Sequence, residues 1–412
     1  MRSRRRLLWI LGLAVGIRVA FVLGYPQVPV VNDAAGYDAT ASHLALKTPL
    51  PEGEDGAGQI RRGPIYVAFL AAIYRCVGHH HAAVRIVQAM LSASAVLLIY
   101  ALGRAVFNAK VGLIASLLAA LYPPFISYPG WLLTETLSVF LLLAFVYSLV
   151  RAWQRSRTIL WMGAGLLGGI TVLHRAEMLL IVGCAVLLAL WWRAGLTHVG
   201  MLALVAALTV VPWMVRNALR FGEFAISVAP GSGNVLWIST VETEGPEWDA
   251  NAAHLQEYRA LVAGATPHEA DRRLRRDAIR RILTQPLKYL KLCVKRVPAF
   301  WVGGHSNTFL HLGGSIGSYV VQREYGKVAV KLAMFVYNMG IVALGLWGMH
   351  LVWKLGMVDP RPVALMVMPV VVTAFTHCAL FAALRYQVPI MAFVIVFAAF
   401  TLWHARRALT EP

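Results

Sequence analysis

Charged residues are scarce in this sequence. They make up 14% of its 412 residues, whereas a typical soluble domain contains roughly 25%. Hydrophobic residues make up 59%, and only a lipid solvent lets so many apolar side chains face outward. The composition therefore excludes an ordinary soluble enzyme and predicts an all-α protein that crosses the lipid bilayer many times.

Cysteine and acidic residues are also few. The four cysteines, Cys76, Cys184, Cys293 and Cys378, form no CxxC pair, so neither a disulfide framework nor a cysteine zinc site is predicted. The 19 acidic residues compare with 38 basic ones, which gives a net charge of +19. In a soluble protein this excess would favour a nucleic-acid partner. In a membrane protein short cytoplasmic loops collect Lys and Arg, so no nucleic-acid partner is predicted.

About ten apolar stretches are candidate membrane spans, because a span needs about 20 mostly apolar residues. They lie near Leu7–Tyr25, Val84–Gly103, Val111–Ser127, Thr134–Val150, Thr158–Leu173, Met178–Trp192, His198–Val215, Val328–Val352, Pro362–Leu384 and Val388–His404. The first stretch follows a basic N-terminus and resembles a signal peptide. Because no clear cleavage site follows, we interpret it as an uncleaved span.

Basic residues set the orientation of these spans. With the N-terminus inside, Arg104 and Arg151 fall in short loops on the inner side, as the positive-inside rule requires. Both termini are then cytoplasmic, and two long loops, residues 26–83 and 216–327, lie on the outer face. We expect a single domain over residues 1–412 with these loops forming the active-site face, because functional residues concentrate on such loops.

Two further apolar stretches are expected to lie on the outer surface of the membrane. Pro64–Val77 is too short for a span, and counting it as one would place Arg151 outside. We interpret it as an interfacial or re-entrant helix. Leu287–Trp301 interleaves Lys288 and Lys291 with apolar residues, which is the pattern of an amphipathic helix in the headgroup region.

The segment from Asn32 to Asp38 contains the first candidate for chemistry. If a helix begins here, Asn32 can cap it, and Asp33 and Tyr37 share one face at the i, i+4 spacing, while Asp38 points elsewhere. A carboxylate fixed at a membrane surface can act as a general base on a hydroxyl. The alternative is that Asp33 only stabilises the helix start through the helix dipole.

Three arginines near the outer face are candidates for binding phosphate. Arg62 precedes Pro64, Arg175 lies between the fifth and sixth spans, and Arg385 enters the last span. The planar guanidinium group matches the geometry of phosphate. The alternatives are anchoring at the membrane interface for Arg62 and Arg385, and an ion pair with Glu177 for Arg175.

Two charges close to the bilayer and one histidine tract complete the candidates. Glu135 lies at the outer end of the fourth span, where an acid is costly and indicates function, with a helix-start acid as the alternative. Arg18, in the outer half of the first span, either extends outward or meets an anionic group. His79-His80-His81 looks like a metal tract, but three adjacent histidines do not share a helix face, so no metal site is predicted there.

Taken in order, these segments resemble the GT-C superfamily of membrane glycosyltransferases. Within it they are most similar to the branch of protein O-mannosyltransferases and lipid A aminoarabinose transferases. The resemblance covers about residues 7–405 and rests on Asp33-Ala-Ala-Gly-Tyr37, Arg62-Gly63-Pro64, Tyr100-Ala-Leu-Gly-Arg104, Leu121-Tyr122-Pro123, Leu133-Thr134-Glu135, Pro212-Trp213, Arg216-Asn217 and Arg385-Tyr386-Gln-Val-Pro389. Two positions depart from the family pattern. Ala34 stands where many members have a second acid, and Gly63 replaces the first proline of a basic-Pro-Pro element.

The resemblance implies a GT-C fold with about ten transmembrane helices plus interfacial helices in the outer loops. It implies an inverting hexosyl- or pentosyltransferase that takes a sugar from a polyprenyl-phosphate donor in the bilayer to a hydroxyl acceptor on a protein, lipid or glycan. The implied site residues are the catalytic base Asp33, the donor-phosphate ligands Arg62, Arg385 and Arg175, and the acceptor- or sugar-orienting Glu135 and Tyr37.

No cofactor is implied, and relatives on this branch mostly need no catalytic metal. The alternative is a divalent metal held by the acidic pair of Asp33 and Glu135, as in other GT-C enzymes that use acids on outer loops.

Two other functions compete with this one. A lipid-linked glycan transporter or flippase would need polar groups across the whole bilayer, whereas the ionisable residues gather on one side. A non-catalytic subunit of envelope glycan assembly would keep its function after Asp33→Asn. The Ala-, Leu- and Arg-rich composition favours a bacterial inner (plasma) membrane, with the active site on the outer face.

Overall fold

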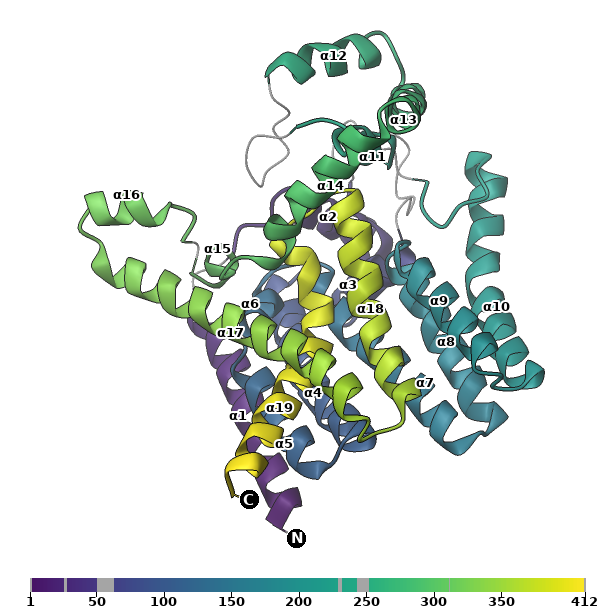
Figure 1. Cartoon of the computed structure of the whole chain (residues 1–412). Coiled ribbons are helices and arrows are strands. Elements are labelled where there is room, and N and C mark those ends of the chain that lie inside the picture. Colours follow the sequence, from purple (N-terminus) through teal and green to yellow (C-terminus); the bar gives the residue numbers. More distant parts are fainter. Residues whose placement is uncertain are drawn as a thin grey trace.

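The computed structural model describes residues 2–25, 28–49, 63–228, 232–242, 252–310 and 312–410. Every regular element in these ranges is a helix (Figure 1). This confirms the all-α fold class that the composition predicts.

Within the described residues, seven helices are long and apolar enough to span a bilayer. They are α1 (Arg2–Gly24), α4 (His81–Val106), α7 (Glu135–Arg155), α10 (Leu196–Phe221), α17 (Tyr325–Leu355), α18 (Pro360–Ala379) and α19 (Val388–Thr410). An eighth candidate is a pair bent by 60°, in which α5 (Ala109–Leu121) is followed by α6 (Pro123–Ser127) and η1 (Tyr128–Gly130). The chain is therefore a multi-pass membrane protein.

The ten predicted spans correspond to these elements and to two shorter apolar helices, α8 (Thr158–His174) and α9 (Met178–Trp191). A full crossing by α8 and α9 stays a prediction. The remaining helices are α2 (Asp33–Leu46), α3 (Pro64–Val77), α11 (Ser232–Ile238), α12 (Ala252–Val262), α13 (Pro267–Thr284), α14 (Pro286–Trp301), α15 (Ser306–Leu310), α16 (Ile316–Val321) and η2 (Leu384–Gln387). Thus α3 has the predicted bounds.

The start of α1 and the end of α19 lie together at one end of the bundle, and α2 and α11 to α14 lie at the other end (Figure 1). An even number of crossings gives this arrangement, because it returns the chain to the side on which it began. The two long loops predicted from the sequence therefore share one end of the molecule.

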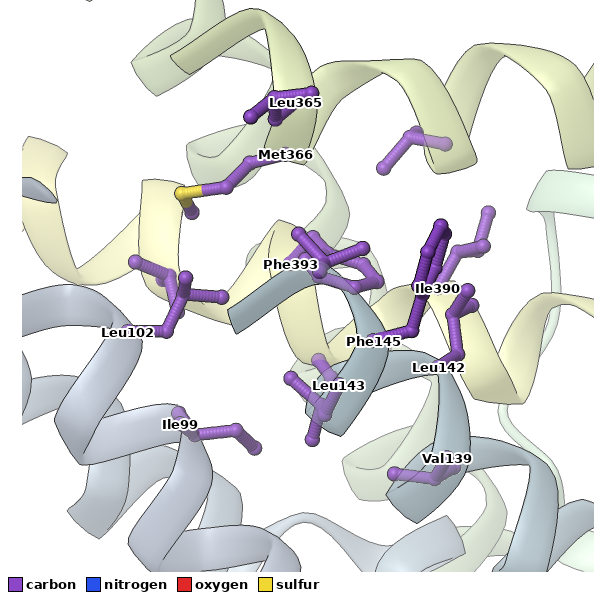
Figure 2. Close-up of a cluster of buried hydrophobic side chains, with 14 of the residues drawn as sticks. Ile99, Leu102, Val139, Leu142, Leu143, Phe145, Leu365, Met366, Ile390 and Phe393 are labelled. Carbon is purple, nitrogen blue, oxygen red and sulfur yellow. The ribbon is translucent and has the colours of Figure 1, made fainter. Parts of the chain in front are cut away.

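Helix α19 forms the centre of the bundle. Every side chain from Ile390 to Phe400 is buried, so neighbouring helices rather than lipid surround this stretch on all sides. Figure 2 shows side chains of α4, α7, α18 and α19 meeting in this core. The labelled members are Ile99, Leu102, Val139, Leu142, Leu143, Phe145, Leu365, Met366, Ile390 and Phe393.

Small residues let α17 approach α19 closely. A Cβ atom added at Gly345 would lie 2.6 Å from the carbonyl oxygen of Val394, and one added at Gly348 would lie 2.6 Å from Oγ1 of Thr401. Such small-residue contacts are typical of helix pairs in membranes, where close backbone packing replaces the hydrophobic effect as the source of association.

Arg18 faces neither of the two directions expected for it. Its side chain is fully buried, and its guanidinium donates to the carbonyl oxygens of Ala119 at 3.0 Å and Ala120 at 3.1 Å and to Oγ of Ser92 at 2.9 Å. Helix α5 ends here, before Pro123. The last carbonyls of a helix have no partner within the helix and attract cations, so Arg18 stabilises the break in the α5–α6 pair.

The predicted amphipathic helix is present as α14. Its apolar side chains Leu287, Leu290 and Val294 are 74%, 57% and 62% exposed, and their i, i+3, i+7 spacing places them on one face. Tyr289 joins the helix to the bundle by donating its hydroxyl to the carbonyl oxygen of Ala379 at 2.7 Å. The position of this apolar face in the headgroup region stays a prediction.

The histidine tract lies at the break between α3 and α4 rather than within one helix. The expectation that these side chains diverge is therefore wrong for two of them. His79 and His81 both contact the carboxylate of Asp38, with Nε2 to Oδ1 distances of 2.9 and 3.1 Å.

Candidate active site

Asp33 is the first residue of α2, at the end of the bundle that carries the long loops. Asn32 occupies the N-cap position but makes no capping hydrogen bond with its side chain, so the predicted cap is wrong. The Asp33 carboxylate is 39% exposed, and its Oδ2 lies 3.3 Å from Nη2 of Arg385. These two residues are 352 positions apart, and both were predicted site residues.

Arg385 and Arg175 lie on the same aromatic ring. The guanidinium carbons of Arg385 and Arg175 are 4.8 and 5.3 Å from the ring centroid of Tyr386. Nη2 of Arg385 also donates to the Tyr386 hydroxyl at 2.8 Å, and His377 of α18 stacks on this ring at 4.3 Å. An aromatic face attracts cations through its quadrupole. Tyr386 therefore gathers two of the three predicted phosphate-binding arginines.

The turn between α8 and α9 holds Arg175 by an ion pair. Nε of Arg175 donates to Oε1 of Glu177 at 2.5 Å, as the pairing alternative anticipated. Burial lowers the pKa of Arg175, but the carboxylates of Glu177 and Glu135 outweigh it and raise this pKa above its ordinary value. Arg175 is consequently a permanent cation that is only 12% exposed.

A buried histidine connects this turn to the start of α7. Nε2 of His174 lies 2.8 Å from Oγ of Ser138 and 3.2 Å from the carbonyl oxygen of Thr134. A carbonyl oxygen only accepts, so we assign the proton to Nε2. Because Thr134 precedes Glu135, the contact brings Glu135 to the same end of α8 as Arg175.

Glu135 is the most enclosed acid of the predicted set. Only 2% of its surface is exposed, and in the described part of the chain its Oε2 has no hydrogen-bond partner. A buried carboxylate oxygen without a donor is costly. Such an atom is a natural acceptor for a hydroxyl supplied by a ligand.

Gly63 explains one departure from the family pattern. A Cβ atom at this position would clash with the carbonyl oxygen of Leu173 and lie 2.8 Å from that of His174. Proline has a Cβ atom, so it does not fit where α3 begins against the end of α8. Arg62, the third predicted phosphate ligand, lies outside the described residues, but its neighbour Gly63 contacts the residues that lead into Arg175.

Tyr37 lies one helical turn after Asp33 and packs on α3. Its ring meets Tyr66 edge to face, with centroids 5.0 Å apart, and Tyr66 in turn meets the ring of His174 at 6.3 Å. The Tyr66 hydroxyl donates to Oε1 of Gln88 at 3.2 Å. This series of rings joins α2, α3 and α8 and holds Asp33 close to the turn that bears Arg175.

The structure therefore brings predicted residues together from separate elements. Asp33 meets Arg385, Arg385 and Arg175 share Tyr386, and Glu135 acts electrostatically on Arg175. Sequence reasoning assigned no role to His377, which lies in an apolar span, and named Tyr386 only as part of the motif that follows Arg385. No local spacing indicates either contact, because the partners come from different helices.

A catalytic metal between Asp33 and Glu135 stays an untested alternative. In the structure the cation beside Asp33 is the guanidinium of Arg385, with Nη2 3.3 Å from Oδ2. Among the described residues, the three-ligand group that can hold a metal consists of Asp38, His79 and His81. It contains neither acid of the predicted pair.

A family model agrees with these features over part of the chain. The model of dolichyl-phosphate-mannose-protein mannosyltransferases matches residues 61–215. This range contains Gly63, Glu135 and Arg175. Comparison with curated protein sequences gives no match.

Solved structures agree over nearly the whole chain. The archaeal oligosaccharyltransferase AglB from Archaeoglobus fulgidus, in complex with an inhibitory peptide and a dolichol-phosphate, has 16% identity and a TM-score of 0.55 over 98% of this chain and 51% of that one. The apo form of the Archaeoglobus fulgidus oligosaccharyltransferase has 16% identity and a TM-score of 0.58 over 98% and 52%. ArnT from Cupriavidus metallidurans in the apo state has 11% identity and a TM-score of 0.46 over 97% and 78%.

The chain thus spans about half the length of the oligosaccharyltransferase that it matches. At this identity the likeness is one of fold. The expected helical architecture is present over almost all of the sequence, and the family model covers the part that holds the α3 to α8 contacts. Together these matches show that the chain has the GT-C fold, the architecture of the superfamily of membrane glycosyltransferases that its motifs resemble.

Proposed function

We propose that this protein is an inverting glycosyltransferase that moves a sugar from a polyprenyl-phosphate donor to a hydroxyl acceptor on the outer face of a bacterial inner membrane. One observation carries the proposal. In a GT-C fold, a partly exposed carboxylate, Asp33, contacts Arg385, and Arg385 shares the Tyr386 ring with Arg175. A base and a site for an anion are therefore adjacent at the end of the bundle that bears the long loops.

The reaction follows from these two parts. The acceptor oxygen attacks the anomeric carbon from the side opposite the phosphate, and its proton passes to the Asp33 carboxylate. The bond from the anomeric carbon to the phosphate oxygen breaks, and its electron pair leaves with the polyprenyl phosphate. The leaving group is already an anion, so it needs charge stabilisation rather than an acid, and the guanidiniums of Arg385 and Arg175 supply it.

Arg385 has two roles in this scheme. Without a donor it neutralises Asp33. A donor phosphate offers the guanidinium two oxygens in a matching geometry, which favours exchange of the Asp33 contact for the phosphate. Asp33 then stays ionised and can accept the proton of the acceptor hydroxyl. Donor binding therefore activates the base.

The other predicted residues complete the site. Glu135, with its unpartnered Oε2, would accept a hydrogen bond from a hydroxyl of the sugar or acceptor. Tyr37 would orient the same groups from α2. Arg62 would add a third guanidinium, because Gly63 contacts the residues leading into Arg175.

The related structures support a lipid-linked donor. The oligosaccharyltransferase from Archaeoglobus fulgidus was solved with a dolichol-phosphate and with an acceptor peptide, and the matched family is named for dolichyl-phosphate-mannose. The sugar, hexose or pentose, and the acceptor, protein, lipid or glycan, are properties to be measured. No specific observation favours the two alternative functions, a lipid-linked glycan transporter and a non-catalytic subunit of envelope glycan assembly.

The test is sugar release or transfer from a panel of radiolabelled polyprenyl-phosphate sugars by the protein in lipid nanodiscs, with and without EDTA. We expect Asp33→Asn to lower turnover by about 10²–10⁴-fold, the range for loss of a general base. Asp359→Asn is the matched control, because it makes the same change just before the start of α18, whereas Arg385 lies in η2, beyond the end of that helix. EDTA sensitivity would indicate a catalytic metal. Wild-type turnover by Asp33→Asn would exclude this mechanism.

A further inference from the structure

A second polar cluster lies beside the candidate active site but outside it. It consists of Asp38 on α2, His79 and His81 at the junction of α3 and α4, and Tyr74 on α3, and we call it the Asp38 cluster. The potential ligand atoms of Asp38, His79 and His81 all lie within 4.8 Å of one another. None of these residues has a role in the proposed glycosyl transfer.

The backbone between α3 and α4 turns two histidines to the same side. Helix α3 ends at Gly78, whose φ of 81° lies in the left-handed region that favours glycine. His80 follows in an extended conformation, with φ −120° and ψ 104°. In extended chain, residues i and i+2 point the same way and the residue between them points away. His79 and His81 therefore both reach Asp38, and His80 does not take part.

Three donors converge on one carboxylate oxygen. Oδ1 of Asp38 lies 2.5 Å from the Tyr74 hydroxyl, 2.9 Å from Nε2 of His79 and 3.1 Å from Nε2 of His81. A carboxylate oxygen has two lone pairs, so these contacts crowd it. In a tetrahedral zinc site with bonds of about 2.0 to 2.2 Å, neighbouring ligand atoms are about 3.4 Å apart. The nitrogen-to-oxygen spacing in the cluster is close to this value.

Asp38 is an ionised ligand and faces away from the active site. Burial raises its pKa, but hydrogen bonds from His81, Tyr74 and His79 outweigh that effect and lower the pKa to about 2. It lies five positions after Asp33, which places the two side chains about 140° apart around α2. The Tyr74 hydroxyl would act as the outer partner that orients the carboxylate.

We propose that Asp38, His79 and His81 form a binding site for a divalent transition-metal ion, with zinc as the best match. Two imidazole nitrogens and one carboxylate are a common zinc ligand set, and imidazole also suits other late first-row metals. The side chains of His79 and His81 are 40% and 32% exposed, so the ion can enter and keep a water as its fourth ligand. The proposal goes beyond the proposed function because it involves none of the transfer residues.

The metal would act as a clamp on the first outer loop. Asp38 belongs to α2 and the histidines follow α3, so one ion would link the segment before residues 50–62 to the segment after them. That stretch includes the predicted phosphate ligand Arg62. Because ligand binding to the folded state stabilises it, zinc would hold α2, and with it Asp33, against α3.

The test is zinc binding by the untagged or Strep-tagged protein in nanodiscs, stripped with a chelator and titrated with Zn²⁺ against a chromogenic zinc indicator. We expect one Zn²⁺ per chain for the wild type. His81→Gln, His79→Gln and Asp38→Asn should each weaken binding by at least about 10–100-fold, since removal of even an outer partner has effects of this size. His80→Gln is the matched control and should bind like the wild type.

A second measurement separates lost ligands from lost folding. Thermal unfolding without metal gives each variant its own baseline. Added Zn²⁺ should raise the melting temperature of the wild type and of Asp33→Asn above their baselines but should not raise that of His81→Gln. Absence of stoichiometric Zn²⁺ binding by the wild type would overturn the proposal. So would equal weakening by His80→Gln and His81→Gln. Because neither readout uses turnover, failure of the transferase proposal would leave this test intact.

Discussion

Helix α2 carries two carboxylates in different surroundings. Asp33, at its first residue, is 39% exposed and contacts Arg385, which lies 352 positions away. Asp38 is 14% exposed and accepts hydrogen bonds from residues no more than 43 positions away. The first contact spans 3.3 Å, whereas the contacts of Asp38 with His79 and His81 are 2.9 and 3.1 Å.

Under the proposed mechanism, this contrast separates the carboxylate that would react, Asp33, from one that is held in place, Asp38. A general base has to be accessible to the acceptor hydroxyl, and it has to be able to separate from the cation that pairs with it. The Asp33 side chain is 39% exposed. Its cation, Arg385, has the Tyr386 hydroxyl as a second partner. A metal ligand or a structural acceptor has to be held in place, and Asp38 is held from three directions. Residues of one type on one helix thus take different roles according to what surrounds them.

The largest effect should appear when Asp33 and Asp38 are each replaced by Asn and the two variants are compared. Asp33→Asn should reduce turnover of the polyprenyl-phosphate sugar by about 10²–10⁴-fold, while Asp38→Asn should stay within about tenfold of the wild type, because it touches no reacting atom. Zinc binding should be weakened by Asp38→Asn and unchanged by Asp33→Asn. Parallel turnover and zinc titrations on both variants check this, and equal loss of turnover in both would remove the distinction.

The next effect should come from the cation that Asp33 contacts. Arg385→Gln should lower kcat/KM by about 10²–10³-fold, as expected when a group that stabilises the developing charge is lost. Arg385→Lys should recover little, because an ammonium lacks the guanidinium fork. Arg280→Gln is the control, since Arg280 lies on α13, at the same end of the bundle as α2, and its side chain is 73% exposed. Full recovery by lysine would show that only charge matters.

The sequence predicted the local features of this comparison better than the distant ones. Helix α3 begins and ends where its apolar run does. Asp33 and Tyr37 lie one helical turn apart on α2, as their i, i+4 spacing predicts. The contact between Asp33 of α2 and Arg385 of η2 joins residues 352 positions apart, and no local spacing encodes it. The order of family motifs was what indicated a shared site.

Errors in the sequence interpretation arose where helices break. His79 and His81 converge because the chain is extended between α3 and α4, whereas helical spacing predicted divergence. Arg18 turns inward because α5 stops and leaves carbonyl groups without partners. The end of α5 falls inside a predicted apolar stretch, and the end of α3 was predicted without the extended backbone that follows it.

A smaller effect should come from the contact between the start of α3 and the end of α8, which precedes Arg175. Gly63→Ala places a Cβ against the carbonyl oxygens of Leu173 and His174, and overpacking of this kind costs about 1–3 kcal/mol. We expect a lower melting temperature in nanodiscs and reduced turnover. Gly163→Ala in α8 is the control, because its Cβ would meet nothing within 4 Å. Equal melting temperatures for both variants would contradict the close approach.

The smallest effect should come from acid acting on Asp38. Its pKa is lowered from 3.8 to about 2 in the folded protein, so its ionised form stabilises the fold by about 2 kcal/mol in metal-free protein. A lowered pKa adds stability that is fully present above pH 4 and is lost as the pH falls toward 2. Melting temperatures of wild type and Asp38→Asn, measured with chelator present, should therefore differ by a constant amount from pH 7 to pH 5 and converge near pH 2. A difference that grows on acidification would mean that the histidines, rather than the carboxylate, hold this cluster together.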